Sequence, residues 1–169
     1  MVKPLIVDLE YPTLEVLPSR QDALVIAPAY SGLKGELTAI LSYQYHYLYF
    51  YEEYRDIAET LAGISLAEML HFRLLGKILK KLGTSPVLSS LPPYQFNFYN
   101  TSSVSISKTP QKMLLDDIGG EMEAIMSYKR MLENLSNENV GAFISRIILD
   151  EELHVKILKE QLEKINKKS

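Results

Sequence analysis

The sequence lacks cysteine altogether, and only three of its 169 residues are histidine. Without thiols the chain can form no disulfide, no iron–sulfur cluster and no cysteine-based zinc site. It also lacks an uninterrupted apolar run of about 18 residues, so we expect no membrane span. A net charge of −3 argues against a non-specific nucleic-acid partner. The N-terminus has acids and prolines where a signal peptide needs an apolar run, so we expect a cytoplasmic protein.

What is present is typical of one all-α domain, with 47% hydrophobic and 23% charged residues. Spaced prolines predict that residues 1–29 form an extended arm over the surface or over a neighbouring subunit. Apolar side chains at three- and four-residue steps then predict four helices. The predicted helices cover about 29–54, 56–82, 110–135 and 140–165.

The linker between the second and third helices is long and has no periodicity. Residues 83–109 are rich in proline, serine and threonine, as a crossover along the length of a helical bundle would be. Gly83 suits the end of one helix, and Thr109 followed by Pro110 suits the start of the next. We therefore expect residues 30–169 to form a four-helix bundle, made of a hairpin at 30–82, the crossover at 83–109 and a hairpin at 110–166.

The two predicted hairpins repeat one pattern. The segment ELTAILSY at 36–43 matches EMEAIMSY at 121–128 at five of eight positions. The segment EMLHFRLLGKIL at 68–79 matches EELHVKILKEQL at 151–162 in its Glu, Leu and His. Each copy thus has a glutamate on its first helix and a Glu-x-x-His on its second, and these fall at the same height in an up-down hairpin.

Two facing hairpins would gather four carboxylates and two imidazoles at core-facing positions in the middle of the bundle. Four buried carboxylates cannot stay ionised together without compensation. Two divalent cations would cancel their charge, with both histidines neutral and acting as nitrogen donors. The six residues are Glu36, Glu68, His71, Glu121, Glu151 and His154.

These paired motifs resemble the ferritin-like superfamily of di-iron and di-manganese proteins, and in particular its small manganese-catalase-like and rubrerythrin-like members. The resemblance covers about residues 30–165 and implies that the six residues are metal ligands. It also implies that Glu68 and Glu151 bridge the two ions. One departure is Ala124, at the position where rubrerythrins usually have a second glutamate on the third helix.

Other polar residues near the motifs have open roles. Tyr43 and Tyr128 lie two turns after Glu36 and Glu121 and are candidates to donate hydrogen bonds to carboxylates around the ligands. Asp150 either orients a histidine across the bundle or lies at the surface. His46 points off the ligand face, which favours a packing or interface role. The tyrosine-rich run at 43–54 suggests contact with a second subunit, as in a homo-oligomer.

The expected function is that of a di-metal oxidoreductase. Carboxylate-rich ligation suits two Mn or Fe ions more than zinc or copper. The expected substrate is hydrogen peroxide or dioxygen, and catalase- or peroxidase-type detoxification is the leading activity. A ferritin-like iron-binding ferroxidase is the alternative, and a scaffold in which metals only stabilise the bundle is a third possibility.

Overall fold

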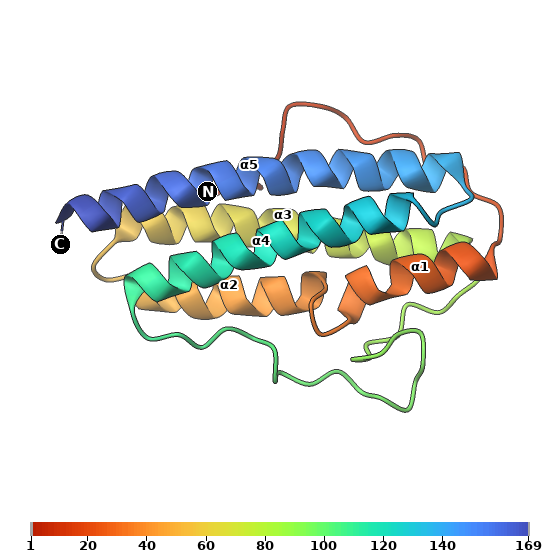
Figure 1. The fold of residues 1–169 in the computed structure, drawn as a ribbon, viewed down its shortest axis with the longest axis horizontal. Coiled ribbons are helices and arrows are strands. Elements are labelled where there is room, and N and C mark those ends of the chain that lie inside the picture. The colour runs from red at the N-terminus through yellow and green to blue at the C-terminus, as the bar shows by residue number, and fades with distance from the viewer. Residues whose placement is uncertain (1, 169) are drawn as a thin grey trace.

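The computed structural model describes residues 2–168, so Met1 and Ser169, at the ends of the predicted arm and bundle, lie outside the described residues. Its helices are α1 (Arg20–Ser31), α2 (Glu36–Phe50), α3 (Arg55–Lys81), α4 (Pro110–Leu132) and α5 (Glu138–Lys168). Figure 1 shows α1 and α2 end to end, so that together they make one of the four columns of an all-α bundle. No helix within residues 2–168 is long and apolar enough to cross a membrane.

The first column differs from the sequence prediction in two ways. Residues 20–29, predicted to be extended, belong to α1, which begins after the N-cap Ser19. Pro28 lies inside this helix, so proline did not exclude helix here. The column then breaks at residues 32–35, where glycine permits a tight turn: a Cβ on Gly35 would lie 2.5 Å from the carbonyl oxygen of Ala29. The last helical residue before the turn is Phe50, earlier than the predicted Tyr54.

The long crossover lies where it was predicted, between α3 and α4, and carries the chain back along the bundle (Figure 1). Gly83 ends α3 with a positive φ of 86°, and the Thr109 side chain accepts a hydrogen bond from the Lys112 amide at the start of α4. Hydrogen bonds attach the crossover to the first column. One joins Ser42 Oγ to the amide of Ser105 at 3.0 Å.

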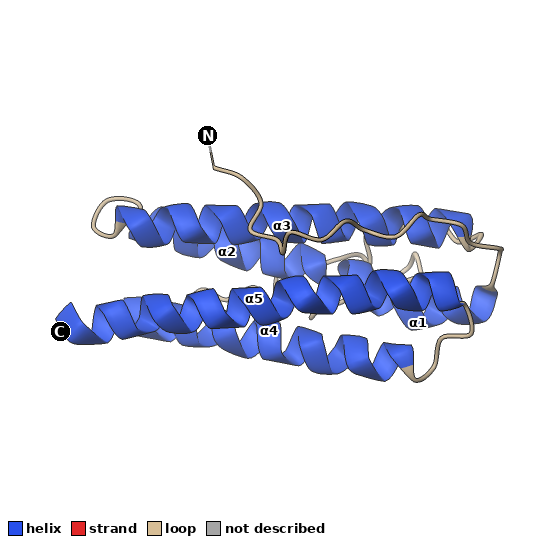
Figure 2. Cartoon of the chain, turned by 90° about the horizontal axis from the view of Figure 1, so that it is seen from above, coloured by secondary structure: helices blue, strands red, loops and turns tan. Residues whose placement is uncertain are grey.

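The N-terminal segment before α1 lies between α3 and α5 (Figure 2). The Leu5 amide donates to the Gly63 carbonyl of α3 at 3.0 Å. A Cβ on Gly63 would lie 2.8 Å from the Leu5 side chain, so glycine at this position permits the close approach. On the other side Arg146 of α5 donates to the carbonyls of Val7 and Leu9 at 2.9 and 2.8 Å. The extended arm of residues 2–18 is therefore bound to the bundle at both flanking helices.

The buried apolar side chains form two clusters at opposite ends of the bundle. One joins α1 to the C-terminal halves of α3 and α4 and the start of α5, and includes Ile26, Leu75 and Ile144. The other joins α2 to the N-terminal halves of α3 and α4 and the far part of α5, and includes Leu61 and Leu114. The two Glu-x-x-His motifs lie between these clusters, in a part of the core that is polar.

Candidate metal centre

The six residues singled out by the repeat are brought together in the middle of the bundle. All are buried, with at most 4% of any of them exposed. Their oxygen and nitrogen atoms form two groups, and within each group the potential ligand atoms lie within 4.8 Å of one another. The first group consists of Glu36, Glu68, His71 and Glu151, and the second of Glu68, Glu121, Glu151 and His154.

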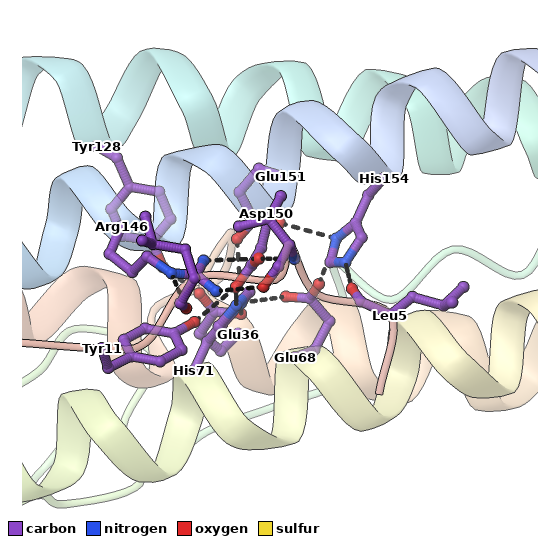
Figure 3. Close-up of polar contacts among 12 residues, drawn as sticks. Leu5, Tyr11, Glu36, Glu68, His71, Tyr128, Arg146, Asp150, Glu151 and His154 are labelled. Atoms are coloured by element: carbon purple, nitrogen blue, oxygen red, sulfur yellow. Dashed lines mark hydrogen bonds and ion pairs between the residues drawn. The ribbon is translucent and has the colours of Figure 1, made fainter. Parts of the chain in front are cut away.

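Glu68 and Glu151 belong to both groups, and each directs one oxygen to each histidine (Figure 3). Glu68 places Oε2 at 3.5 Å from His71 Nδ1 and Oε1 at 3.1 Å from His154 Nδ1. Glu151 places Oε1 at 3.2 Å from His71 Nδ1 and Oε2 at 3.0 Å from His154 Nδ1. This arrangement would suit two ions that share Glu68 and Glu151, and Glu36 and Glu121 would each add a carboxylate to one group.

The tautomer of His154 follows from its surroundings. Its Nε2 lies 2.7 Å from the carbonyl oxygen of Leu5, which can only accept a hydrogen bond. Nε2 must therefore carry the proton, and the lone pair of the neutral ring is on Nδ1. This lone pair faces the carboxylates of Glu151 and Glu68, an arrangement that is repulsive unless a cation or a second proton lies between them.

His71 has the same orientation with a different partner. Its Nε2 lies 3.1 Å from Oδ2 of Asp150, a fully buried carboxylate on α5. Burial acts to raise the pKa of Asp150, but hydrogen bonds from His71, Tyr11 and Arg146 outweigh it and lower the pKa to about 2. Because Asp150 is ionised, His71 donates from Nε2 and turns Nδ1 toward the glutamates.

Three buried atoms at the centre have no hydrogen-bond partner among the described residues. They are Glu68 Oε1, His71 Nδ1 and Glu151 Oε1. An unsatisfied buried polar atom is costly, and cations in the two groups would satisfy these three atoms. The donor set of four carboxylates and two imidazoles therefore fits a pair of divalent cations, and a buried dinuclear centre is consistent with both groups.

The electrostatics of the site favour the same conclusion. Burial and the neighbouring charge of Glu68 raise the pKa of Glu36, and burial and the charge of Glu151 raise the pKa of Glu121. Burial alone would lower the pKa of His154, but its carboxylate neighbours, Glu121 foremost, raise it. In a protein without metal, protons would thus take the place of the missing positive charge, and metal binding would displace them.

Two tyrosines hold the terminal glutamates, and they do so across the repeat. The Tyr43 hydroxyl donates to Glu121 Oε1, and the Tyr128 hydroxyl donates to Glu36 Oε1. The sequence singled out both tyrosines as hydrogen-bond donors to carboxylates near the ligands. In the structure they bond the candidate ligands themselves, and each bonds the glutamate of the other hairpin. Burial raises the pKa of both hydroxyls, which keeps them protonated as donors.

The N-terminal arm completes the shell around both histidines, which the sequence did not reveal. Besides the Leu5 carbonyl, the Val7 amide and the Tyr11 hydroxyl donate to Asp150 at 2.8 and 2.6 Å. Arg146 pairs with Asp150 at 2.7 Å. Among these missed residues, only Arg146 could have been found from the sequence. It is a charged residue one turn before Asp150 on an otherwise apolar stripe of α5, which indicates a buried ion pair. The sequence left two roles open for Asp150, orientation of a histidine or a place at the surface. In the structure Asp150 is buried and bonded to His71, so it orients a histidine.

A cavity of about 820 Å³ reaches the centre between α2, α4 and the crossover. Glu36, Glu68 and Glu121 line its inner end, together with both tyrosines. Its wall includes Gly119 and Gly120 of α4, where an added Cβ would meet nothing within 4 Å. Small molecules can therefore approach the two groups from this side.

Comparison with known proteins supports the fold. The ferritin-like domain family matches residues 31–168, and no curated protein sequence matches the chain. Wild-type KatB, a manganese catalase from Anabaena, superposes with a TM-score of 0.80 at 19% identity over 97% of this chain and 78% of its own. Bacterioferritin from Rhodobacter capsulatus superposes with a TM-score of 0.69 at 20% identity over 90% of this chain and 89% of its own.

A third structure is bacterioferritin BfrA from Mycobacterium tuberculosis, with a TM-score of 0.67 at 21% identity over 90% of each chain. At such identities these structures support the fold alone. The family match, in contrast, covers all four columns of the bundle except for most of α1. The chain belongs to the ferritin-like domain family.

Proposed function

We propose that this protein is an oxidoreductase that acts on hydrogen peroxide or dioxygen at two Mn or Fe ions, with catalase- or peroxidase-type removal of peroxide as its activity. The observation that carries the proposal is the pair of four-residue groups that share Glu68 and Glu151. Two ions held by groups that share two residues could act on both oxygens of an O–O bond. A carboxylate-rich donor set with one nitrogen in each group suits Mn and Fe.

In this proposal the six residues hold the ions, and the pair of ions supplies or accepts the two electrons of peroxide chemistry. The chain contributes orientation and access. Asp150 and the Leu5 carbonyl fix the two histidine rings, and Tyr43 and Tyr128 fix the terminal glutamates. The cavity beside Glu36 and Glu121 admits the substrate. A catalase cycle uses peroxide both as oxidant and as reductant, which suits a chain without a cysteine-ligated redox centre.

The decisive experiment measures oxygen release from hydrogen peroxide by protein loaded with Mn and, separately, with Fe. We expect release without any added reductant, and we expect it to be lost in Glu68→Gln, because Glu68 belongs to both groups. Consumption of peroxide only with an added reductant would indicate a peroxidase. A loaded protein that neither releases oxygen nor consumes peroxide would refute the proposal.

A ferroxidase is the second candidate, and the observation that favours it is the family match together with the likeness to two bacterioferritins. The discriminating measurement is the stoichiometry of iron uptake under air. Uptake of many irons for each chain would favour iron handling, whereas saturation at two irons would favour the oxidoreductase.

We also propose that the protein forms a homo-oligomer. Leu48 and Tyr49 on the outer side of α2 are 69% and 50% exposed, and Tyr51 follows them. Such a concentration of exposed apolar and aromatic surface favours contact with another subunit. A ferritin-related structure of similar fold, from Bacteroides fragilis, is a dodecamer. Light scattering coupled to size exclusion tests the proposal, and a monomer at micromolar concentration would refute it.

A further inference from the structure

A second buried pair of titratable groups lies beside the cavity, outside the six candidate ligands. His46 of α2 is fully buried, and its Nδ1 lies 2.8 Å from Oδ1 of Asp117 on α4. The side chain of Asp117 is 2% exposed. The pair joins α2 to α4 one helical turn before Glu121, which is about 6 Å along the helix axis. The sequence favoured a packing or interface role for His46 and gave none to Asp117.

The hydrogen bonds around His46 fix where its protons are. The Ser105 hydroxyl of the crossover donates to Asp116 Oδ2 at 2.9 Å, so its oxygen must accept from His46 Nε2, 3.0 Å away. Nε2 therefore carries a proton. Since both Nδ1 and the carboxylate oxygen have lone pairs, a second proton must lie between His46 Nδ1 and Asp117 Oδ1.

The other oxygen of Asp117 has no partner. Oδ2 is buried and makes no hydrogen bond to any described residue, although Asp117 lines the cavity that leads to Glu121. The remaining titratable groups around the pair are Tyr43 and Tyr45 on α2 and Asp116 on α4. None of these groups is hydrogen-bonded to Oδ2, so the one unpartnered oxygen of Asp117 belongs to a residue that lines the cavity.

We propose that Asp117 is the proton-transfer residue of the centre, that its Oδ2 exchanges a proton with peroxide in the cavity, and that His46 is the residue that positions it. This inference rests on the proposed peroxide activity. Oxidation of one peroxide breaks two O–H bonds and yields dioxygen, two protons and two electrons. Asp117 Oδ2 takes one proton, water in the cavity takes the other, and the electrons go to the pair of ions.

Reduction of a second peroxide reverses the balance. Cleavage of its O–O bond takes up the two electrons and two protons and yields two waters; Asp117 returns the proton that it had stored, and water in the cavity returns the other. A local group that lends and recovers a proton leaves only one proton in each half-reaction to be exchanged with water. Burial raises the pKa of Asp117, with His46 opposing, and a raised pKa favours a carboxyl group that both takes up and returns a proton.

The test compares three variants of the metal-loaded protein. Asp117→Asn keeps the shape and the acceptor for His46 but cannot transfer a proton, and we expect oxygen release to fall by about 10²- to 10⁴-fold. Metal content and melting temperature should stay as in the wild type. Asp117→Ala should lose activity in the same way and recover it when formate is added, because formate can enter the cavity. The matched control is Glu123→Gln, another carboxylate of the cavity lining, half-exposed and paired with Lys34 at 2.8 Å, which should keep full activity.

A second readout does not depend on turnover. Infrared spectra of the metal-loaded protein should contain a protonated-carboxyl band that titrates above the range of exposed carboxylates and is missing from Asp117→Asn. Wild-type turnover and an unchanged solvent isotope effect in Asp117→Asn would overturn the inference. The inference would also be overturned if formate did not restore oxygen release to Asp117→Ala and the wild type had no protonated-carboxyl band. Asp117 would then have a structural role. If the wild type itself acts on no peroxide, the proposed function fails at that step and the inference falls with it.

Discussion

Replacement of Asp150 by asparagine should weaken one metal site and spare the other. Asp150 is bonded to His71 Nε2 at 3.1 Å, whereas His154 Nε2 is bonded to the Leu5 carbonyl, which the substitution does not touch. An asparagine amide can still accept a hydrogen bond from Nε2 of His71, but it lacks the charge that strengthens this bond and favours a proton on Nε2. The hydrogen bond that directs Nδ1 into the site is therefore weakened.

The magnitude follows from the role of such partners in other metal sites. Loss of a hydrogen-bond partner to a ligating histidine typically costs about 10- to 100-fold in metal affinity. This range corresponds to about 1.4 to 2.7 kcal/mol at the first group. Stability should also fall, because an aspartate held at a pKa of about 2 contributes about 2 to 3 kcal/mol at neutral pH.

The assay is a titration of metal-free protein with Mn in competition with an indicator dye, which resolves the two binding constants. We expect one constant to weaken by the stated factor while the other keeps its wild-type value. The control is Glu152→Gln, two residues further along α5, which is half-exposed and pairs with Lys129 at 3.5 Å. Equal weakening of both constants, or no weakening of either, would refute the assignment of Asp150 to His71.

Four further predictions concern the histidine ligands, metal removal, the tyrosines and the arm. His71→Ala and His154→Ala should each lose about one equivalent of tightly bound metal, as measured by elemental analysis, and retention of both ions would disprove the ligand assignment. Metal-free protein should melt at a lower temperature than the loaded protein. Metal at about 100 times its Kd adds about 2.7 kcal/mol to the free energy of unfolding for each site. Equal melting temperatures in calorimetry would contradict a buried site. Tyr43→Phe should weaken the site of Glu121 and not that of Glu36, and a loss at both sites in the dye titration would show that the crossed pairing is wrong. Gly63→Val should displace the arm, because a Cβ has no room there, and limited proteolysis should then cut residues 2–18 faster; unchanged cleavage would contradict the contact.

Much of the bundle could be predicted because local signals agree with the global fold. The crossover has no periodicity and ends in a Thr-Pro cap, so both of its boundaries were found within about a residue. The six residues were found because a duplicated pattern on amphipathic helices fixes both their face and their height. Three-residue spacing within a helix is enough to place Glu68 beside His71.

The missed features depend on tertiary contacts that leave no periodic signal. Spaced prolines suggested an extended segment through residue 29, yet Pro28 fits within α1, and Ser19 caps its start. The carbonyl group of Leu5 belongs to the backbone, so the residue type at position 5 does not indicate a hydrogen bond with His154. The pairing of Tyr43 with Glu121 is a contact between hairpins, which a comparison within each repeat cannot reveal.

The role of His46 was missed for a related reason. A single histidine off the ligand face is predicted to be a packing residue. Its partner Asp117 is distant in sequence and had no assigned role. Burial of both groups becomes visible only when α2 and α4 are placed side by side. The sequence therefore reveals a repeated ligand set more readily than the single polar pair beside it.

The most direct test of the central claim is anomalous diffraction at the Mn and Fe absorption edges from crystals of protein purified from its native host. We expect two ions for each chain, with Glu68 and Glu151 bridging them and with Nδ1 of His71 and His154 as the nitrogen ligands. A single ion, or six side chains that surround water alone in crystals grown with ample metal, would contradict this expectation.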